Sequence, residues 1–152
     1  PFSMLLNLAA VANAENKDQL WGFIKRYAQD ASPENNPQLN QAASFAVSYY
    51  NDFVKPQKVY RLPNLTEREA LTDLRNKLSD FKGDRDAEDL QSIVFACGRE
   101  KFDPLRDWFK ALYEVLLGAS QGPRFGGFIA LYGIQETIEL IEKALDGMFV
   151  KD

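Results

Sequence analysis

The stretch that decides the fold runs from Phe102 to Leu145 and reads FDPLRDWFKALYEVLLGASQGPRFGGFIALYGIQETIELIEKAL. Its first helix is predicted to have Asp103 as N-cap and Pro104 at the first helical position. An aspartate side chain there accepts a hydrogen bond from a free backbone N–H, and proline has no N–H to leave unpaired. Apolar residues then recur at spacings of three and four until Gly118, a residue typical of a helix C-terminus. This pattern predicts an amphipathic helix with one buried face.

Two further helices are predicted in the same stretch. Gly122-Pro123 opens the first of them, and Gly133 ends it. Gly126-Gly127 lies inside its apolar pattern, where close packing of two backbones explains the glycines better than a phosphate-binding loop does. The last helix follows Gly133 directly and has isoleucine and leucine at helical spacing.

Upstream, the same signals predict five more helices, so that about eight helices fill the chain. These five helices are predicted to begin near Ser3, Asp18, Leu39, Thr66 and Asp86. Thr66 is expected to form a capping box with Glu69. No stretch alternates cleanly enough to form a sheet. We therefore predict an all-α fold, either an irregular bundle or a short superhelix, with subdomains 1–55 and 66–152 joined by an extended segment 56–65.

Composition restricts the chemistry of the chain. With 152 residues, 45% of them hydrophobic, it can bury one ordinary core, and no apolar run is long enough to span a membrane. The absence of histidine excludes Ser-His-Asp and Cys-His catalysis and every histidine-containing metal site. Cys97 shares the apolar face of its helix, so we expect a buried thiol, with a redox or nucleophilic role as the alternative.

Several segments of the chain together resemble one known family. They are PFSMLLNLAAVANAEN at 1–16, YYNDFVKPQKVYRLP at 49–63, WFKALYEVLLG at 108–118 and GPRFGGFIALYG at 122–133. In combination they are similar to the C-terminal region of class I lysyl-tRNA synthetases and, more distantly, to that of glutamyl-tRNA synthetases. The resemblance covers most of the chain and is weakest at 79–89.

The resemblance implies that residues 1–152 are the anticodon-binding region of a cytoplasmic lysine-tRNA ligase that acts in translation. Its implied partners are the anticodon loop of tRNA(Lys) and the N-terminal catalytic domain of the same protein, with no DNA and no membrane. The HIGH-type and KMSKS-type motifs of that catalytic domain are not written in this chain. ATP, lysine and Mg²⁺ are therefore implied for the full-length ligase, and we expect no cofactor, metal or catalysis here. A start at Pro1 rather than Met suggests a piece of a longer protein.

Charge and aromatic residues identify candidates for RNA contact. A net charge of −4 argues against nonspecific binding of nucleic acid. Cations interleaved with aromatic residues can still form a local surface that stacks unpaired bases and contacts phosphates. The candidate tRNA-binding residues are Arg124, Arg106, Lys110, Phe125, Lys101 and Arg61. Arg124 is the first choice, because it stands at a helix start, where backbone N–H groups are expected to face outward.

Each candidate also has a structural interpretation. Arg124 can anchor its loop through hydrogen bonds, Arg106 and Lys110 can belong to a solvated, salt-bridged helix face, and Phe125 can belong to the core. The whole surface can also serve a different function, that of a helical protein-interaction module whose exposed aromatic residues bind another protein without RNA. An independent enzyme with carboxylates as acid and base is the third alternative.

Overall fold

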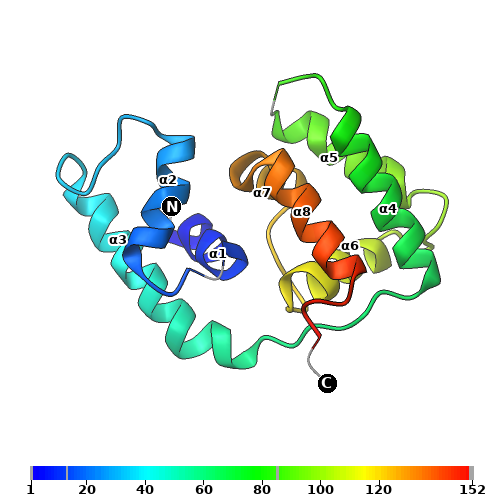
Figure 1. Ribbon diagram of the computed structural model, residues 1–152, viewed down its shortest axis with the longest axis horizontal. Helices are drawn as coiled ribbons and strands as arrows, with labels where there is room; N and C mark the ends of the chain where they lie inside the picture. Colours follow the sequence, from blue (N-terminus) through cyan, green and yellow to red (C-terminus); the bar gives the residue numbers. More distant parts are fainter. Residues whose placement is uncertain (1, 13, 85, 151–152) are drawn as a thin grey trace. The chain divides into compact units, whose positions relative to one another are not determined.

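The computed structural model describes residues 2–12, 14–84 and 86–150. These residues form eight α-helices, shorter helical turns and loops, with no β-strand (Figure 1). The predicted all-α fold is thereby confirmed. The chain divides into two compact units, Pro1–Lys58 and Val59–Asp152, and the division falls inside the predicted extended segment 56–65.

The first unit is built on its third helix. It contains α1 (Phe2–Ala12), α2 (Lys17–Tyr27), α3 (Pro37–Tyr49), a π-helical turn η1 (Tyr50–Val54) and a 3-10 turn η2 (Lys55–Gln57). Both α1 and α2 pack on α3, which brings their apolar faces into one small core. Leu20 and Tyr50 are fully buried in this core. Trp21 closes one side, and its indole Nε1 donates a hydrogen bond to Asn40 Oδ1 at 3.0 Å.

The second unit contains the decisive stretch. Its elements are α4 (Leu65–Asp80), α5 (Ala87–Gly98), α6 (Arg106–Leu112), the π-helical turn η3 (Tyr113–Leu117), α7 (Phe125–Tyr132) and α8 (Ile134–Leu145). Figure 1 shows α4, α5, α7 and α8 gathered into one bundle, in which α5 packs on α7 and α4 packs on both α5 and α8. Within the described parts of the chain, no helix is long and apolar enough to cross a lipid bilayer.

Some predicted helix starts are wrong by a few residues, and that of α7 is one of them, because α7 begins at Phe125 and not at Gly122-Pro123. The capping box of α4 is made by Asn64 and Glu67, not by Thr66 and Glu69. Asn64 Oδ1 accepts from Glu67 N, and Glu67 Oε1 accepts from Asn64 N, both at 2.8 Å. Asparagine and threonine are both favoured N-cap residues, so Asn64 with Glu67 and Thr66 with Glu69 both match the sequence pattern of a capping box. Glu67 is buried, whereas Glu69 is exposed.

The helix predicted to begin at Asp103 and Pro104 also begins later. α6 starts at Arg106, and no side chain caps it. Other predicted signals are confirmed: Asp86 caps α5 by accepting from Glu88 N at 2.7 Å. Gly118 ends η3 with a left-handed φ of 67°, a conformation that glycine adopts without strain.

Trp108 organises the core of the second unit. It is fully buried, and its indole Nε1 donates to the Val94 carbonyl of α5 at 2.9 Å. A Cβ on Gly98 would lie 2.3 Å from the Trp108 ring, so the ring lies directly against the end of α5. This contact joins α6 to α5 and thereby holds the polar face of α6 in place.

Cys97 is a buried core thiol, as predicted, and burial raises its pKa to about 12. A raised pKa keeps the thiol protonated through neutral and mildly alkaline pH, and the thiolate is the reactive form. We therefore expect no modification of the folded protein by iodoacetamide at pH 8. The same reagent should modify Cys97 once urea unfolds the chain. Mass spectrometry of both samples checks this, and a labelled native protein would contradict it.

Candidate nucleic-acid interface

An open recess of about 660 Å³ lies beside α6 and is called the α6 recess here. Its lining residues are Arg106, Asp107, Phe109, Lys110, Tyr113, Ser120, Gln121 and Gly122. The first five share one side of α6 and η3 because they fall at helical spacing. The loop after Gly118 supplies the other three. The recess therefore combines a helix face that carries rings and cations with a short polar loop.

The two rings of the α6 recess are held in place from behind. Phe109 packs edge-to-face on Phe95 of α5, with ring centroids 5.2 Å apart. Tyr113 donates its hydroxyl hydrogen to the Pro123 carbonyl at 2.9 Å. Both rings are half-buried, so each keeps some surface toward solvent. Rings fixed in this way form a stacking surface that loses little freedom on binding.

Arg106 and Lys110 provide the positive charge of this recess. Both side chains are exposed, and they lie one helical turn apart. Neither forms an ion pair with any residue that the structure describes. The alternative interpretation, in which Arg106 and Lys110 form salt bridges on this helix face, is therefore wrong for the residues that the structure describes. Their charges are available to a ligand, although Asp107 lies beside them.

Arg61, in contrast, is engaged inside the protein. Its Nη1 and Nη2 donate to the two carboxylate oxygens of Glu67 at 2.7 and 2.8 Å, and its Nε donates to Glu114 Oε1 at 2.8 Å. Hydrogen bonding to this guanidinium lowers the pKa of Glu67, although burial of the carboxyl acts in the opposite direction. Arg61 therefore fastens the 59–64 segment to α4 and η3.

A second recess brings Arg61 together with two other candidate cations. Lys101, Lys110 and Arg61 line a cavity of about 430 Å³, called the linker recess. Glu67, Asp103, Asp107 and Glu114 also line it. The four carboxylates outnumber the three cations, and this disfavours binding of a phosphate in the linker recess. Lys110 belongs to both recesses and is the residue that connects them.

Arg124 is the N-cap residue of α7, but its side chain forms an ion pair with Glu88 at the start of α5. The expectation of outward-facing N–H groups at this helix start is wrong for Gly126. Its N–H donates to Gln91 Oε1 at 2.6 Å, and Gln91 is buried. The Arg124 guanidinium itself remains exposed on the surface. Exposed ion pairs are weak, so this one can exchange its partner for a phosphate.

The expectation that Phe125 lies exposed enough to stack a base is wrong. Its ring is fully buried and packs on Phe128, with centroids 5.0 Å apart. The first residue of α7 points into the core because α7 packs closely on α5. A Cβ on Gly126 would lie 2.4 Å from the Ala87 carbonyl oxygen, which confirms close backbone packing at this glycine. Nothing lies within 4 Å of a Cβ on Gly127, so the same explanation is wrong there.

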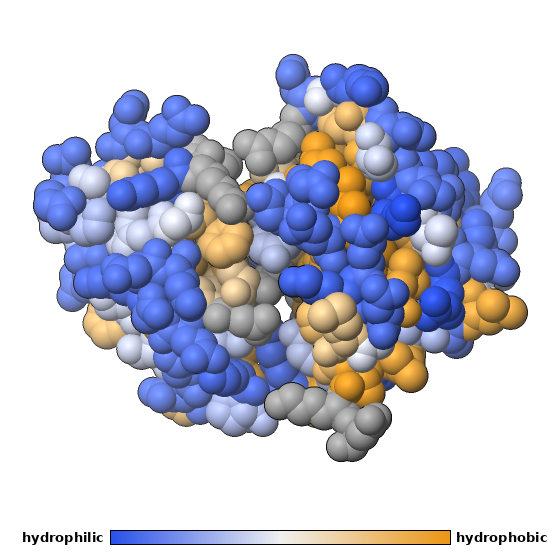
Figure 2. Space-filling model, viewed as in Figure 1, coloured by the Kyte–Doolittle hydropathy of each residue, from blue (hydrophilic) through white to orange (hydrophobic). Residues whose placement is uncertain are grey.

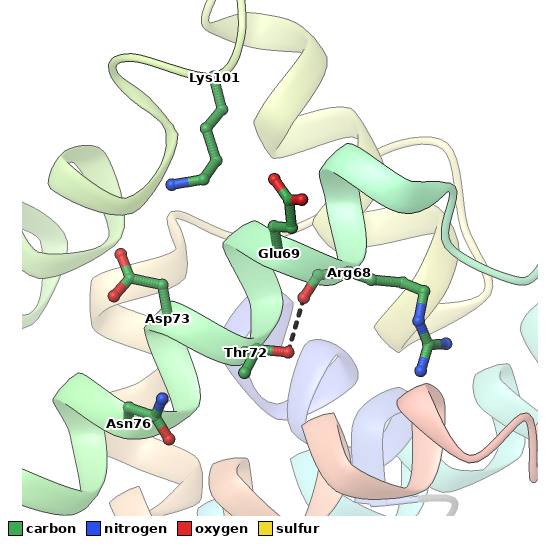
Figure 3. A pocket seen from close by; sticks show the side chains of 6 residues that line it. All are labelled: Arg68, Glu69, Thr72, Asp73, Asn76 and Lys101. Carbon is green, nitrogen blue, oxygen red and sulfur yellow. Dashed lines mark hydrogen bonds between the residues drawn. The ribbon is translucent and has the colours of Figure 1, made fainter.

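A third recess lies along α4 and is less suited to a polyanion. Arg68, Glu69, Thr72, Asp73, Asn76 and Lys101 line it (Figure 3). Figure 3 shows Lys101 reaching toward the side of α4 that carries Glu69 and Asp73, while Arg68 points away. Arg68 instead donates to the Leu145 carbonyl at the end of α8, at 3.0 Å. Within the described residues, no group of three or more acidic or cysteine side chains could hold a metal ion.

Sequence reasoning does not single out three residues of the α6 recess, which are Tyr113, Ser120 and Gln121. Tyr113 could have been found, because it falls four residues after Phe109 and seven after Arg106 on the same side. Ser120 and Gln121 gave no such signal. Their position depends on how the loop between η3 and α7 returns toward α6.

The chain is similar over its full length to part of known lysine-tRNA ligases. It is 68% identical over 152 residues to the lysine-tRNA ligase of Roseobacter denitrificans, and it covers 29% of that protein. Over 145 residues it is 45% identical to the lysine-tRNA ligase of Rickettsia conorii and 46% identical to that of Rickettsia bellii, covering 28% of each. The chain thus spans less than a third of the length of these relatives, and the predicted resemblance to lysyl-tRNA synthetases is confirmed. No protein-family model and no solved structure matches it.

Proposed function

We propose that this chain is the C-terminal helical part of a class I lysine-tRNA ligase and that it recognises the anticodon loop of tRNA(Lys). The observation that carries the RNA-binding part of this proposal is the α6 recess. There, two cations without ion-pair partners among the described residues flank two fixed aromatic rings. Unpaired RNA loops are bound by this combination of ring stacking and phosphate contact. The similarity to lysine-tRNA ligases supports the choice of tRNA.

Arg106 and Lys110 are proposed as the principal contacts, with Lys101 beside them. Arg124 is proposed as a further contact that exchanges its Glu88 partner for a phosphate on binding. Arg61 would act indirectly, by positioning Glu114 and the segment that borders Lys110. Aminoacylation with ATP, lysine and Mg²⁺ would take place in the catalytic domain of the ligase, in the cytoplasm. We expect this chain alone to have no ligase activity.

The salt dependence of tRNA binding tests this proposal. Each phosphate that a protein neutralises on single-stranded RNA contributes about 0.7 to the slope of log K against log salt concentration. The double variant Arg106→Ala/Lys110→Ala is therefore expected to lower this slope by about 1.4, twice the single contribution. Fluorescence anisotropy with tRNA(Lys) and with an anticodon-swapped tRNA, at several salt concentrations, measures both affinity and preference.

Arg99→Ala is the matched control, because Arg99 is exposed and lies outside the lining of the α6 recess. It should leave the slope and the preference for tRNA(Lys) unchanged. A wild-type slope of zero together with equal affinity for the two tRNAs would reject the proposal. A double variant with the wild-type slope would reject the assignment of these two residues.

The remainder of the ligase is the second proposed partner. Val59, Leu62, Leu65 and Met148 are large apolar side chains of the second unit that are 56–75% exposed. Figure 2 shows hydrophobic residues among the hydrophilic surface of this unit. Apolar surface of this kind is typical of contacts between domains or proteins. These exposed apolar side chains also favour a second candidate function, a protein-interaction module without RNA binding. A slope of zero for log K of tRNA binding against log salt concentration would support this second function.

A further inference from the structure

We propose that three exposed aromatic residues of the first unit form a surface on which the remainder of the ligase docks. They are Phe45 and Tyr49 of α3 and Phe53 of η1, and together they are called the aromatic stripe. This inference rests on the proposed function, because it requires the chain to be the C-terminal part of a longer ligase. It adds a contact surface on the first unit, whereas the exposed apolar side chains described above belong to the second unit.

The aromatic stripe follows one side of a continuous helical segment. Phe45, Tyr49 and Phe53 are 60%, 45% and 59% exposed, and the rings of the last two have their centroids 5.0 Å apart. In an α-helix, four residues rotate by about 40° more than one full turn. The π-helical turn η1 holds more residues in each turn and rotates each of them less, which offsets this drift. The turn thus keeps the third ring on the same side as the first two.

The core of the first unit lies on the other side of this segment. Ala43, Ala46 and Val47 of α3 are buried there, and Tyr50 is buried at the start of η1. A helix at the surface of a globular protein usually carries polar and charged residues on its outer face. Single exposed apolar side chains are ordinary, but a contiguous row of large rings marks an interaction surface. The aromatic stripe therefore requires a partner that covers it.

The charge of this helix face favours a protein partner over RNA. Residues 37–54, all of which the structure describes, contain no lysine or arginine, and Asp52 is their single charged residue. Lys55 follows, but it forms an ion pair with Glu15, and Lys58 donates to a carbonyl group of α1. Binding of single-stranded RNA combines stacking rings with cations that contact the phosphates. The centre of a protein interface is instead rich in aromatic residues and poor in charged ones.

The remainder of the ligase is the protein that the observations favour. The chain spans less than a third of the length of its lysine-tRNA ligase relatives, so most of such a ligase lies outside it. In the proposed C-terminal part, the preceding polypeptide enters the first unit through α1, and α1 packs on α3. The preceding domain is thereby tethered to the helix that carries the aromatic stripe. Tethering raises the effective concentration of that domain and favours its docking over that of a separate protein.

Photocrosslinking in the full-length ligase identifies the occupant. Benzoylphenylalanine in place of Tyr49 is expected to link, at the mass of one polypeptide, to a peptide outside residues 1–152. The same group in place of Gln29, an exposed residue of the turn after α2, is the matched control and should not link to that peptide. A product of double mass would indicate a second copy, and a link to added tRNA(Lys) would indicate RNA. Either product in place of the intramolecular link overturns the inference.

Maleimide labelling measures how far the aromatic stripe is covered. Ser48 is exposed in this chain and adjoins Tyr49, so Ser48→Cys places a thiol there and keeps the three rings. In the full-length ligase this thiol should react on the order of tenfold more slowly than that of Gln29→Cys, because the docked domain covers it. Adding Phe45→Ala and Phe53→Ala should restore most of the rate, since aromatic anchors contribute much of the free energy of an interface.

Peptide mass spectrometry distinguishes each introduced thiol from Cys97 and from other cysteines of the ligase. Circular dichroism checks that each variant is folded. Equal labelling rates for Ser48→Cys and Gln29→Cys would mean that the aromatic stripe is uncovered in the full-length ligase. This result would overturn the inference as well.

The outcomes separate this inference from the function on which it rests. Lysylation of tRNA(Lys) by the full-length protein tests the proposed function, and the crosslink and the labelling rate are measured without it. If the protein lysylates tRNA(Lys) but the aromatic stripe is uncovered, the function stands and the docking surface is overturned. If the intramolecular link forms but the protein does not lysylate tRNA(Lys), the docking surface stands and the ligase function fails.

Discussion

Replacing Gly126 with alanine is expected to lower the free energy of unfolding by about 3 kcal/mol, the upper end of the usual range for inserting a group into a packed core. The new Cβ would lie 2.4 Å from the Ala87 carbonyl oxygen and 2.6 Å from the Gln91 backbone nitrogen. Both atoms belong to the backbone of α5, so neither can move aside as the end of a side chain can. Relief requires α7 to move away from α5.

Such a movement has a second cost. Gly126 N donates to Gln91 Oε1 at 2.6 Å, and this bond satisfies the buried carboxamide of Gln91. Separation of the two helices leaves a buried polar group without its partner, which is expensive. Urea unfolding followed by circular dichroism measures the combined effect.

Gly127→Ala is a matched control one residue further along α7. Nothing lies within 4 Å of a Cβ at this position. Alanine is favoured over glycine inside a helix by about 0.5–1 kcal/mol, so this variant should be as stable as the wild type or slightly more stable. Equal destabilisation by both substitutions would contradict the close approach of α5 and α7 at Gly126.

The second large effect is expected for Arg61→Ala. Its guanidinium bonds to both oxygens of Glu67, which is only 6% exposed, and to Glu114. Removing one partner of a buried ion pair costs about 3–5 kcal/mol, because the other charge stays buried without compensation. The Arg61 side chain is 39% exposed, so solvent screens part of the loss and about 3 kcal/mol is expected. Arg61→Lys should recover little, since lysine cannot bind both oxygens in the same geometry.

The pH dependence identifies the ion pair as the cause. Arg61 lowers the pKa of Glu67 in the folded protein below its ordinary value of 4.5. Because the pKa of Glu67 is lower in the folded than in the unfolded protein, the ion pair stabilises the folded protein fully at pH values above 4.5. This contribution is lost as the pH falls through the lower folded value. The cost of Arg61→Ala in urea unfolding should therefore be largest near neutral pH and shrink in acid. A cost that is the same at pH 7 and pH 3 would contradict this account.

The local parts of the fold could be predicted from the sequence. Asp86, Gly118 and Gly133 end or begin helices as expected, because capping and left-handed glycine depend on a few neighbouring residues. The capping box of α4 shows the limit of such patterns. Two overlapping spacings satisfied the rule, and contact of Glu67 with Arg61 accompanies the one that the structure contains.

The candidate site was predicted only as a set of residue types. Arg106 and Lys110 meet in one recess because they share a side of one helix, which periodicity can indicate. The burial of Phe125 could have been read in the same way, because Phe125, Phe128 and Ile129 fall at i, i+3 and i+4 and are all buried. What the pattern could not indicate is which helix covers that face, since the contact of α7 with α5 joins segments that are far apart in the sequence.

By itself, the sequence determined that the chain is helical, where most of its helices lie and that it resembles lysyl-tRNA synthetases. These properties follow from short-range periodicity, capping and the identity of residues along the chain. Only the tertiary structure decided which cations remain available. Arg124 pairs with Glu88, 36 residues away, and Arg61 with Glu114, 53 residues away, whereas Arg106 and Lys110 meet no carboxylate at ion-pair distance among the described residues. Partners so distant along the chain are brought together by helix packing, because an ion pair depends on distance in space and not on separation in sequence.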